Sequence, residues 1–334
     1  MSNPETSHPQ RWSTFRNISL ALSMLLFASS AAADEGGVSI WLPGANGSFA
    51  AVPGVPGWSF NKVYYHTSVD VGGNVQFPRG GRIDAGLEAK GDLILFGPTY
   101  TLAEPIWNGG MLSLSVLAVG GRMQTSVDAT LTGPNGNQIN GGRTDTLTSY
   151  GDLFPKASIA WNAGVNNYML YAMGALPVGD YKPSRLANTG LGHGAIDIGG
   201  AYTYLNPASG FEASITAGVT YNFENPDTNY QNGIDGHIDW AVSQFFTEQF
   251  HAGVVGYAYQ QLTGDSGGKA FLGDFKSRVF GIGPQMGYKF AVNDTTAGYI
   301  NLKGFYEFGA ENRPEGWNTW LTLSFSPAPP PLAK

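Results

Sequence analysis

The clearest feature of the chain is an alternation of apolar and polar positions that runs over residues 211–224. Its odd positions are apolar, from Phe211 to Phe223, and its even positions are polar or glycine, from Glu212 to Glu224. Successive side chains of a β-strand point to opposite faces, so this pattern predicts a strand with one apolar and one polar face. Its length exceeds the about 5–6 residues usual in soluble proteins and satisfies the about 9–11 that a tilted strand needs to cross a membrane.

The same alternation recurs along most of the chain. It predicts further strands at 58–71, 83–102, 111–123, 150–163, 167–178, 194–206, 233–247, 250–263, 275–291, 296–309 and 316–326. Short and long connections alternate between them, as periplasmic turns and extracellular loops do in membrane barrels. We therefore predict an all-β fold, a transmembrane antiparallel β-barrel of about 12 strands, with apolar faces toward lipid and polar faces toward the lumen.

Two details of this barrel, over residues 58–326, are also predicted. The polar stretch 125–149, rich in glycine and asparagine, is expected to be the longest loop. Pro284 lies within an alternating segment and has no backbone N–H for the ladder, so we expect a β-bulge there.

Three segments fall outside the predicted strands. Residues 1–33 carry Arg11 and Arg16, then an apolar run and a string of small residues, which is the layout of a cleaved signal peptide. Residues 34–57 are rich in proline and glycine and have no steady period, so we expect them to fold into or under the barrel as a candidate plug. Residues 327–334 form a proline-rich tail, expected to be extended.

Composition narrows the class of protein. Removing Glu5, Arg11 and Arg16 with the signal peptide leaves 16 bases and 24 acids, a net charge of −8, which argues against a nucleic-acid partner. Cysteine is absent, so neither disulfides nor thiolate metal sites are available. Charged residues make up 13%, about half the usual share, and 47 residues are glycine. This composition favours an outer-membrane barrel, with a secreted soluble β-protein as the alternative.

Several ionisable and aromatic residues are predicted to point into the lumen. Charges of mixed sign there would line a water path or pair across it. Tyrosines could stack on an aromatic solute, although a membrane-interface belt explains them equally well. The pore-lining candidates are Lys62, His66, Glu88, Lys156, Glu212, Asp235, His237, Asp239, Tyr257, Tyr259, Lys303 and Glu307.

Three motifs suggest other chemistry, and each has a simpler interpretation. The string GDSGG at 264–268 matches the surroundings of a serine-protease nucleophile, but no histidine has the matching context, so we interpret it as a glycine-rich loop. Asp235, His237 and Asp239 share one strand face and could hold a divalent ion. Without a second ligand cluster, a strand whose polar face lines the water-filled lumen is the better interpretation. We therefore predict no metal or cofactor. Asp227 and Asn229 lack the spacing of a calcium loop and indicate a turn.

The chain also resembles a known family, the outer-membrane proteins linked to the meta-pathway of phenol degradation. The resemblance covers residues 36–326 and includes the strings GDLFPKASIAWNAG, LPVGDYKPSRLANTG and ENPDTNYQNGIDGHIDWAVSQFF. Its most specific part is the run YxYxQxTGDSG from Tyr257 to Gly267, which assigns the protease-like string to a barrel loop.

This resemblance implies a single-chain barrel in the bacterial outer membrane that passes small hydrophobic or aromatic compounds toward their degradation enzymes, and implies no catalytic residues. The expected partners are outer-membrane lipid and lipopolysaccharide, the aromatic solute, and the barrel assembly machinery that reads a last strand ending on Phe325. Two alternatives stay open: a non-specific pore for polar solutes that uses the lumen charges as a filter, and an outer-membrane lipid-acting enzyme with Ser266 as nucleophile.

Overall fold

The computed structural model describes residues 39–76, 82–267 and 276–328, which contain twelve long strands and two short ones. The long strands are β1 (Gly57–Gln76), β2 (Arg82–Thr101), β3 (Met111–Thr132), β4 (Gln138–Ala163), β5 (Asn166–Ala175), β6 (Ala195–Asn206), β7 (Phe211–Asn222), β9 (Asp235–Phe245), β10 (Phe250–Gln261), β12 (Arg278–Asn293), β13 (Thr296–Glu311) and β14 (Glu315–Pro327). The short ones are β8 (Tyr230–Gln231) and β11 (Ser266–Gly267). Within these ranges no helix is long and apolar enough to cross a membrane. The predicted signal peptide lies outside them.

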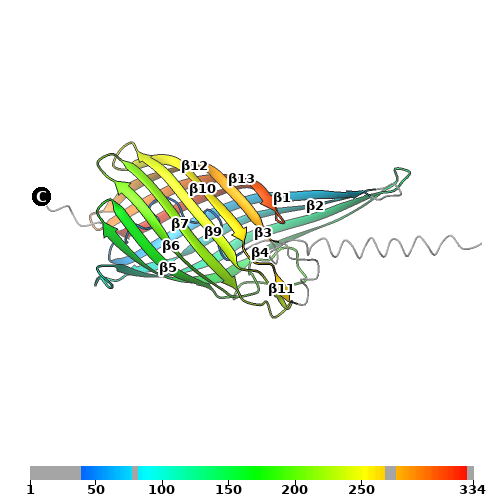
Figure 1. Cartoon of the computed structure of the whole chain (residues 1–334), viewed down its shortest axis with the longest axis horizontal. Coiled ribbons are helices and arrows are strands. Elements are labelled where there is room, and N and C mark those ends of the chain that lie inside the picture. The colour runs from blue at the N-terminus through cyan, green and yellow to red at the C-terminus, as the bar shows by residue number, and fades with distance from the viewer. Residues whose placement is uncertain (1–38, 77–81, 268–275, 329–334) are drawn as a thin grey trace, which may run out of the picture.

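The twelve long strands close into one barrel (Figure 1). Each strand pairs antiparallel with the next along the chain, and β1 closes the ring by pairing with β14 from Phe60↔Phe325 to Asp70↔Glu315. Closure leaves no open edge along this ring, so the backbone groups are satisfied within the wall. The predicted twelve-stranded antiparallel barrel is confirmed.

The two ends of the barrel differ in their connections. The connections at 164–165, 207–210, 246–249 and 294–295 are short and lie at the end where β1 begins and β14 ends. We call this the turn end and the opposite one the loop end. In outer-membrane barrels the short turns are periplasmic and the longer loops extracellular, which orients this chain.

The wall follows the alternation seen in the sequence. On β7, Ile215 and Val219 are 44% and 43% exposed and face outward, whereas Glu212 and Thr216 are fully buried in the interior. The other strands likewise expose large apolar side chains on the outer surface, where lipid can accept them. The same pattern that predicted the strands therefore also gives the wall its apolar outer face.

The first four strands continue beyond the barrel (Figure 1). β1 loses its pairing with β14 after Asp70, yet β3 and β4 stay paired as far as Thr132↔Gln138. The predicted long loop over 125–149 is therefore wrong: it consists of strand, with only residues 133–137 as the connection. Both faces of this extension contact solvent, so it needs no apolar face, and apolar alternation could not reveal it.

The bulge expected at Pro284 is also wrong. The pairs Ile282↔Tyr306 and Gln285↔Lys303 keep one register across this position, and Gly283 and Pro284 simply have no paired residue on β13. The register shifts of this pair of strands lie elsewhere, between Arg278 and Phe280 and between Ala291 and Asn293. A proline removes one donor from the ladder, and here the strand tolerates that loss without inserting a residue.

Candidate functional site

Residues 39–56, which we call the inner segment, lie inside the barrel. Ser39 Oγ donates to Asp235 Oδ2 at 3.1 Å, at the loop end of β9. Phe49 contacts Phe245 and His251, where β9 and β10 meet the turn end. The inner segment therefore runs through the interior from the loop end to the turn end and leads directly into β1.

Near the loop end, the inner segment is held by a stacked ring. Trp41 is 3% exposed and lies parallel to the imidazole of His237, with centroids 3.7 Å apart and planes at 14°. The Tyr171 ring stacks on Trp41 from a greater distance, 6.1 Å. His237 Nε2 lies 2.8 Å from Asp197 Oδ2, which also accepts a hydrogen bond from Thr220. The wall thus fixes both the plane and the position of the ring on which Trp41 rests.

In the middle of the interior, two opposite charges hold a turn of the inner segment. Asp239 accepts hydrogen bonds from the N–H groups of Gly44 at 3.0 Å and Asn46 at 2.9 Å. Lys303 Nζ donates to the carbonyls of Gly44, Ala45 and Asn46 at 2.7, 3.2 and 3.2 Å. The anion binds donors and the cation binds acceptors, so each buried charge is matched by peptide groups. Gly44 has φ +86° here, a conformation that favours glycine.

Near the turn end, a carboxylate and an aromatic cluster receive the inner segment. Glu212 accepts hydrogen bonds from Ser48 Oγ at 2.7 Å and from the Phe49 N–H at 3.1 Å. The Phe49 ring lies 5.7 Å from Phe245, 5.3 Å from His251 and 6.0 Å from Tyr299, between ring centroids. The ammonium of Lys289 lies 4.5 Å from the Phe49 ring and 4.6 Å from the Phe245 ring, within cation–π range. The wall rings Phe245, His251 and Tyr299, together with Lys289, form what we call the aromatic box.

A further aromatic cluster fills the interior beside the inner segment. Tyr257 donates to Glu307 at 2.7 Å, and Asn318 Nδ2 donates to Tyr257 Oη at 3.0 Å. Tyr259 is fully buried, with the guanidinium of Arg313 5.1 Å from its ring. The Tyr257 hydroxyl is satisfied within the wall, so the interior combines aromatic surface with fixed hydrogen bonds.

Nine of the twelve candidate residues face the interior. They are Lys156, Glu212, Asp235, His237, Asp239, Tyr257, Tyr259, Lys303 and Glu307. Among them Glu212, Asp235, His237, Asp239 and Lys303 contact the inner segment directly. That these residues line a path for solute stays a prediction.

The assignments of Lys62 and His66 to the lumen are corrected, because these residues lie on the outer face of β1. Lys62 is exposed and lies between Phe60 and Tyr64, which are 42% and 41% exposed. His66 Nδ1 lies 2.8 Å from Asp92, outside the barrel wall. Both faces of β1 carry aromatic residues, so its alternation did not decide which side is apolar, and Tyr65 instead packs inward against Trp320.

The assignment of Glu88 to the lumen is corrected as well. Its carboxylate lies 2.6 Å from Lys90 Nζ, and both side chains are about half exposed. Glu88 pairs with Asp70, the last residue of β1 that contacts β14, so it lies where the four-stranded extension leaves the barrel. Glu88 lies on the same face of β2 as Ile94 and Phe96, which are 39% and 44% exposed, so its side chain points outward and not into the lumen.

The structure also shows where the three motifs that suggested other chemistry lie. Ser266 is exposed in the short strand β11, whereas its neighbour Asp265 is buried and accepts hydrogen bonds from Gln261 Nε2 and from the Gly233 N–H at 2.9 Å. Asp227 N–H donates to the Asn225 side chain in a turn. Within the described ranges, no group of three or more histidine and carboxylate residues is arranged to hold a metal ion.

The sequence did not single out Trp41, Phe49, Lys289 or Tyr299 as site residues. Trp41 and Phe49 stand in the Pro/Gly-rich segment, where no period assigns a face. Two large rings among small residues were the available signal, because a segment that only spans a gap has no need of them.

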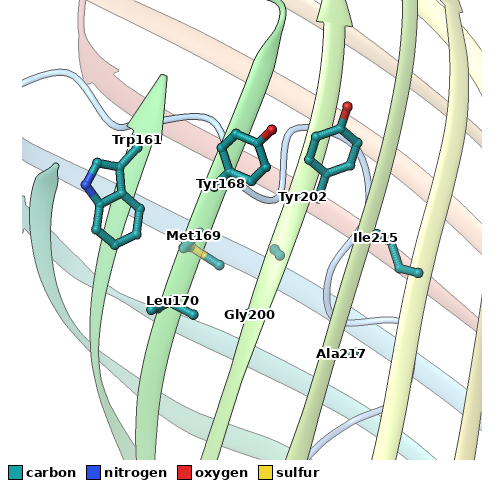
Figure 2. Close-up of a pocket in the computed structure, with 9 residues that line it drawn as sticks. Trp161, Tyr168, Met169, Leu170, Gly200, Tyr202, Ile215 and Ala217 are labelled. Atoms are coloured by element: carbon teal, nitrogen blue, oxygen red, sulfur yellow. The ribbon is translucent and has the colours of Figure 1, made fainter. Parts of the chain in front are cut away.

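A separate apolar hollow lies on the outside of the barrel (Figure 2). Its volume is about 470 Å³, and it is lined by Trp161, Tyr168, Met169, Leu170, Gly200, Ala201, Tyr202, Ile215 and Ala217. Tyr168 and Leu170 are 48% and 55% exposed on the outer wall, so this hollow opens toward lipid and is distinct from the interior.

Comparison with known proteins places the chain in a family. The model of the family described as "Putative MetA-pathway of phenol degradation" matches residues 72–323, more than two thirds of the chain. The chain belongs to this family. No curated protein matches it in sequence.

A solved outer-membrane structure shares its fold, and two further structures are more distant matches. The COG4313 outer membrane channel from Pseudomonas putida F1 is 11% identical over 83% of this chain and 97% of that chain, with a TM-score of 0.63. A Pseudomonas aeruginosa FadL homologue is 7% identical over 81% of this chain and 90% of that chain, with a TM-score of 0.41. The CymD monoaromatic hydrocarbon channel is 8% identical over 82% and 88%, with a TM-score of 0.24. The last two scores are too low to carry an argument. The first, with the closed ring and apolar outer wall, identifies the fold of an outer-membrane β-barrel.

Proposed function

We propose that this protein admits small aromatic compounds through the barrel interior, and that the inner segment is the constriction that controls their passage. The observation that carries the proposal is the inner segment itself. It occupies the interior from one end to the other and places two of its own aromatic rings against aromatic and imidazole side chains of the wall. The family description, which names phenol degradation, supports the class of solute.

The interior charges argue against a polar-solute filter as the main role. Glu212, Asp239 and Lys303 are at most 4% exposed, and each is engaged by backbone or hydroxyl groups of the inner segment. A filter for polar solutes needs such charges to face water. A twelve-stranded barrel is also narrower than the 16–18-stranded porins that hold an open aqueous channel.

We further propose that the chain is not an enzyme. Ser266 is exposed on β11, at the loop end. Among the described residues, no histidine forms a hydrogen bond with it. A nucleophilic serine requires such a base. Outer-membrane lipid and lipopolysaccharide would cover the apolar outer wall, and the barrel assembly machinery would insert the chain.

Uptake of radiolabelled phenol by cells with and without the gene tests the proposal. We expect faster initial uptake when the protein is present, and unchanged uptake with Ser266→Ala. Equal uptake in both strains, combined with a steady, large ionic conductance of the purified protein in planar bilayers, would instead establish the polar-solute pore.

A further inference from the structure

The aromatic box has the shape and chemistry of a site for one six-membered ring. Phe245, His251 and Tyr299 come from β9, β10 and β13, and Lys289 comes from β12. His251 and Tyr299 meet the Phe49 ring nearly edge-on, at 80° and 76° between planes. Such edge-to-face contacts are a favoured geometry of aromatic pairs. Every wall of the box belongs to the barrel, and only its present occupant, Phe49, belongs to the inner segment.

Phe49 has a backbone conformation that phenylalanine rarely adopts. Its φ of +67° lies in the left-handed region, where a bulky residue is a genuine outlier. Strain of this kind persists only where the surroundings enforce it. Here the enforcing contacts are the two hydrogen bonds from the inner segment to Glu212 and the ring contacts in the aromatic box. Withdrawal of the Phe49 ring would therefore release strain as well as vacate the box.

The aromatic box also offers a polar group beyond those that Phe49 can use. His251 is fully buried, and its Nε2 lies 2.9 Å from the Tyr299 hydroxyl. Its other ring nitrogen, Nδ1, has no hydrogen-bond partner among the described residues. A buried nitrogen without a partner is costly, and a ligand that supplies one gains from it. A phenylalanine ring cannot do this, whereas a ring that carries a hydroxyl can.

We propose that Phe49 occupies the place of the transported solute, and that a single-ring phenol binds in the aromatic box by displacing the Phe49 side chain. The bound ring would take over the cation–π contact with Lys289, and its hydroxyl would pair with Nδ1 of His251. Displacement frees the turn end of the inner segment, so the solute itself opens the exit. This inference rests on the proposed function and adds to it a binding site, a solute class and a means of release.

Binding of para-fluorophenol to the purified full-length protein in detergent, followed by fluorine NMR, tests the exchange. Phe49→Ala removes the internal competitor, and we expect the affinity to rise about tenfold. Phe60→Ala is the matched control, because Phe60 lies on the outer wall at 42% exposure, and its affinity should equal that of the wild type. Adding Lys289→Met or His251→Phe to Phe49→Ala should reverse most of the gain.

Unchanged or weaker binding by Phe49→Ala would overturn the proposal, as would an equal gain in Phe60→Ala. Heat-modifiable electrophoretic mobility reports whether each variant is a folded barrel. If Phe49→Ala does not fold, Phe49→Leu retains an apolar side chain without a ring and should still bind about threefold more tightly. Failure of the proposed function looks different: uptake by cells would not depend on the protein, while the gain in binding by Phe49→Ala would persist.

Discussion

The two ends of the inner segment are held in contrasting ways. At the loop end, Trp41 is almost fully buried and stacks face to face on His237. At the turn end, Phe49 is only partly buried, meets His251 and Tyr299 edge-on and has a backbone conformation that phenylalanine disfavours. Between them, Asp239 and Lys303 hold the turn at 44–46. Trp41 therefore acts as a fixed anchor at the loop end, and Phe49 acts as a releasable latch at the turn end. Opening at the turn end need not expel the whole inner segment.

Replacement of Trp41 is the strongest way to abolish the difference between the two ends. Trp41→Ala removes a fully packed ring, and we expect the anchoring of the inner segment to weaken by about 3–5 kcal/mol. In planar bilayers the variant should show long, frequent openings. Phe49→Leu should show only brief ones, and equally long openings in both variants would contradict the distinction between anchor and latch.

Loss of the central charge contacts should have the next largest effect. Lys303→Met removes three donors to the inner segment, at about 1.5–3 kcal/mol for hydrogen bonds to a charged group. Because the chain has no cysteine, Ala45→Cys can report exposure of the segment through its rate of maleimide labelling. We expect faster labelling in Lys303→Met than in the Lys303→Arg control. Equal rates would mean that the turn at 44–46 does not help to hold the inner segment in the barrel.

The conformation of Gly44 offers a smaller and more local change. Gly44→Ala places a methyl group at φ +86°, 2.9 Å from the Phe305 ring, and should cost about 1–3 kcal/mol. We expect a modest increase in open probability with unchanged binding in the aromatic box, which lies at the turn end of the segment. A change in para-fluorophenol affinity would show instead that the central turn and the aromatic box are coupled.

Substitution on the outer wall should have the smallest effect. Lys62→Gln alters a side chain that faces away from the inner segment, so its effect on anchoring should stay within about 0.5 kcal/mol. Conductance and labelling of Ala45→Cys should match those of the wild-type barrel. A marked increase in conductance would return Lys62 to the interior and contradict the face assignment of β1.

The alternation of apolar and polar residues predicted a strand and its outward face correctly where one face was clearly apolar. On β7, the alternation from Phe211 to Asn222 predicted the strand, its outward residues and the burial of Glu212. It failed on β1, where Tyr64 and Tyr65 point to opposite sides and both faces look amphipathic. It also missed the strands within 125–149, because a sheet wetted on both sides carries no apolar period.

The inner segment lay beyond any pattern of neighbouring residues. Its contacts join positions far apart in the chain, such as Gly44 with Asp239 and Ser48 with Gln285. Proline and glycine predicted an irregular path and a segment that folds into or under the barrel. Which residue would be anchored and which would be latched depends on the three-dimensional wall.

The direction of the inner segment has a consequence for biogenesis. The chain descends through the ring from the extracellular mouth and turns at the periplasmic rim into β1, the same strand that closes the seam with β14. A barrel that had already closed could take up the inner segment only if the chain threaded through it. The simplest order of assembly therefore leaves β1 and β14 unpaired until the inner segment lies in place, and their pairing then encloses it.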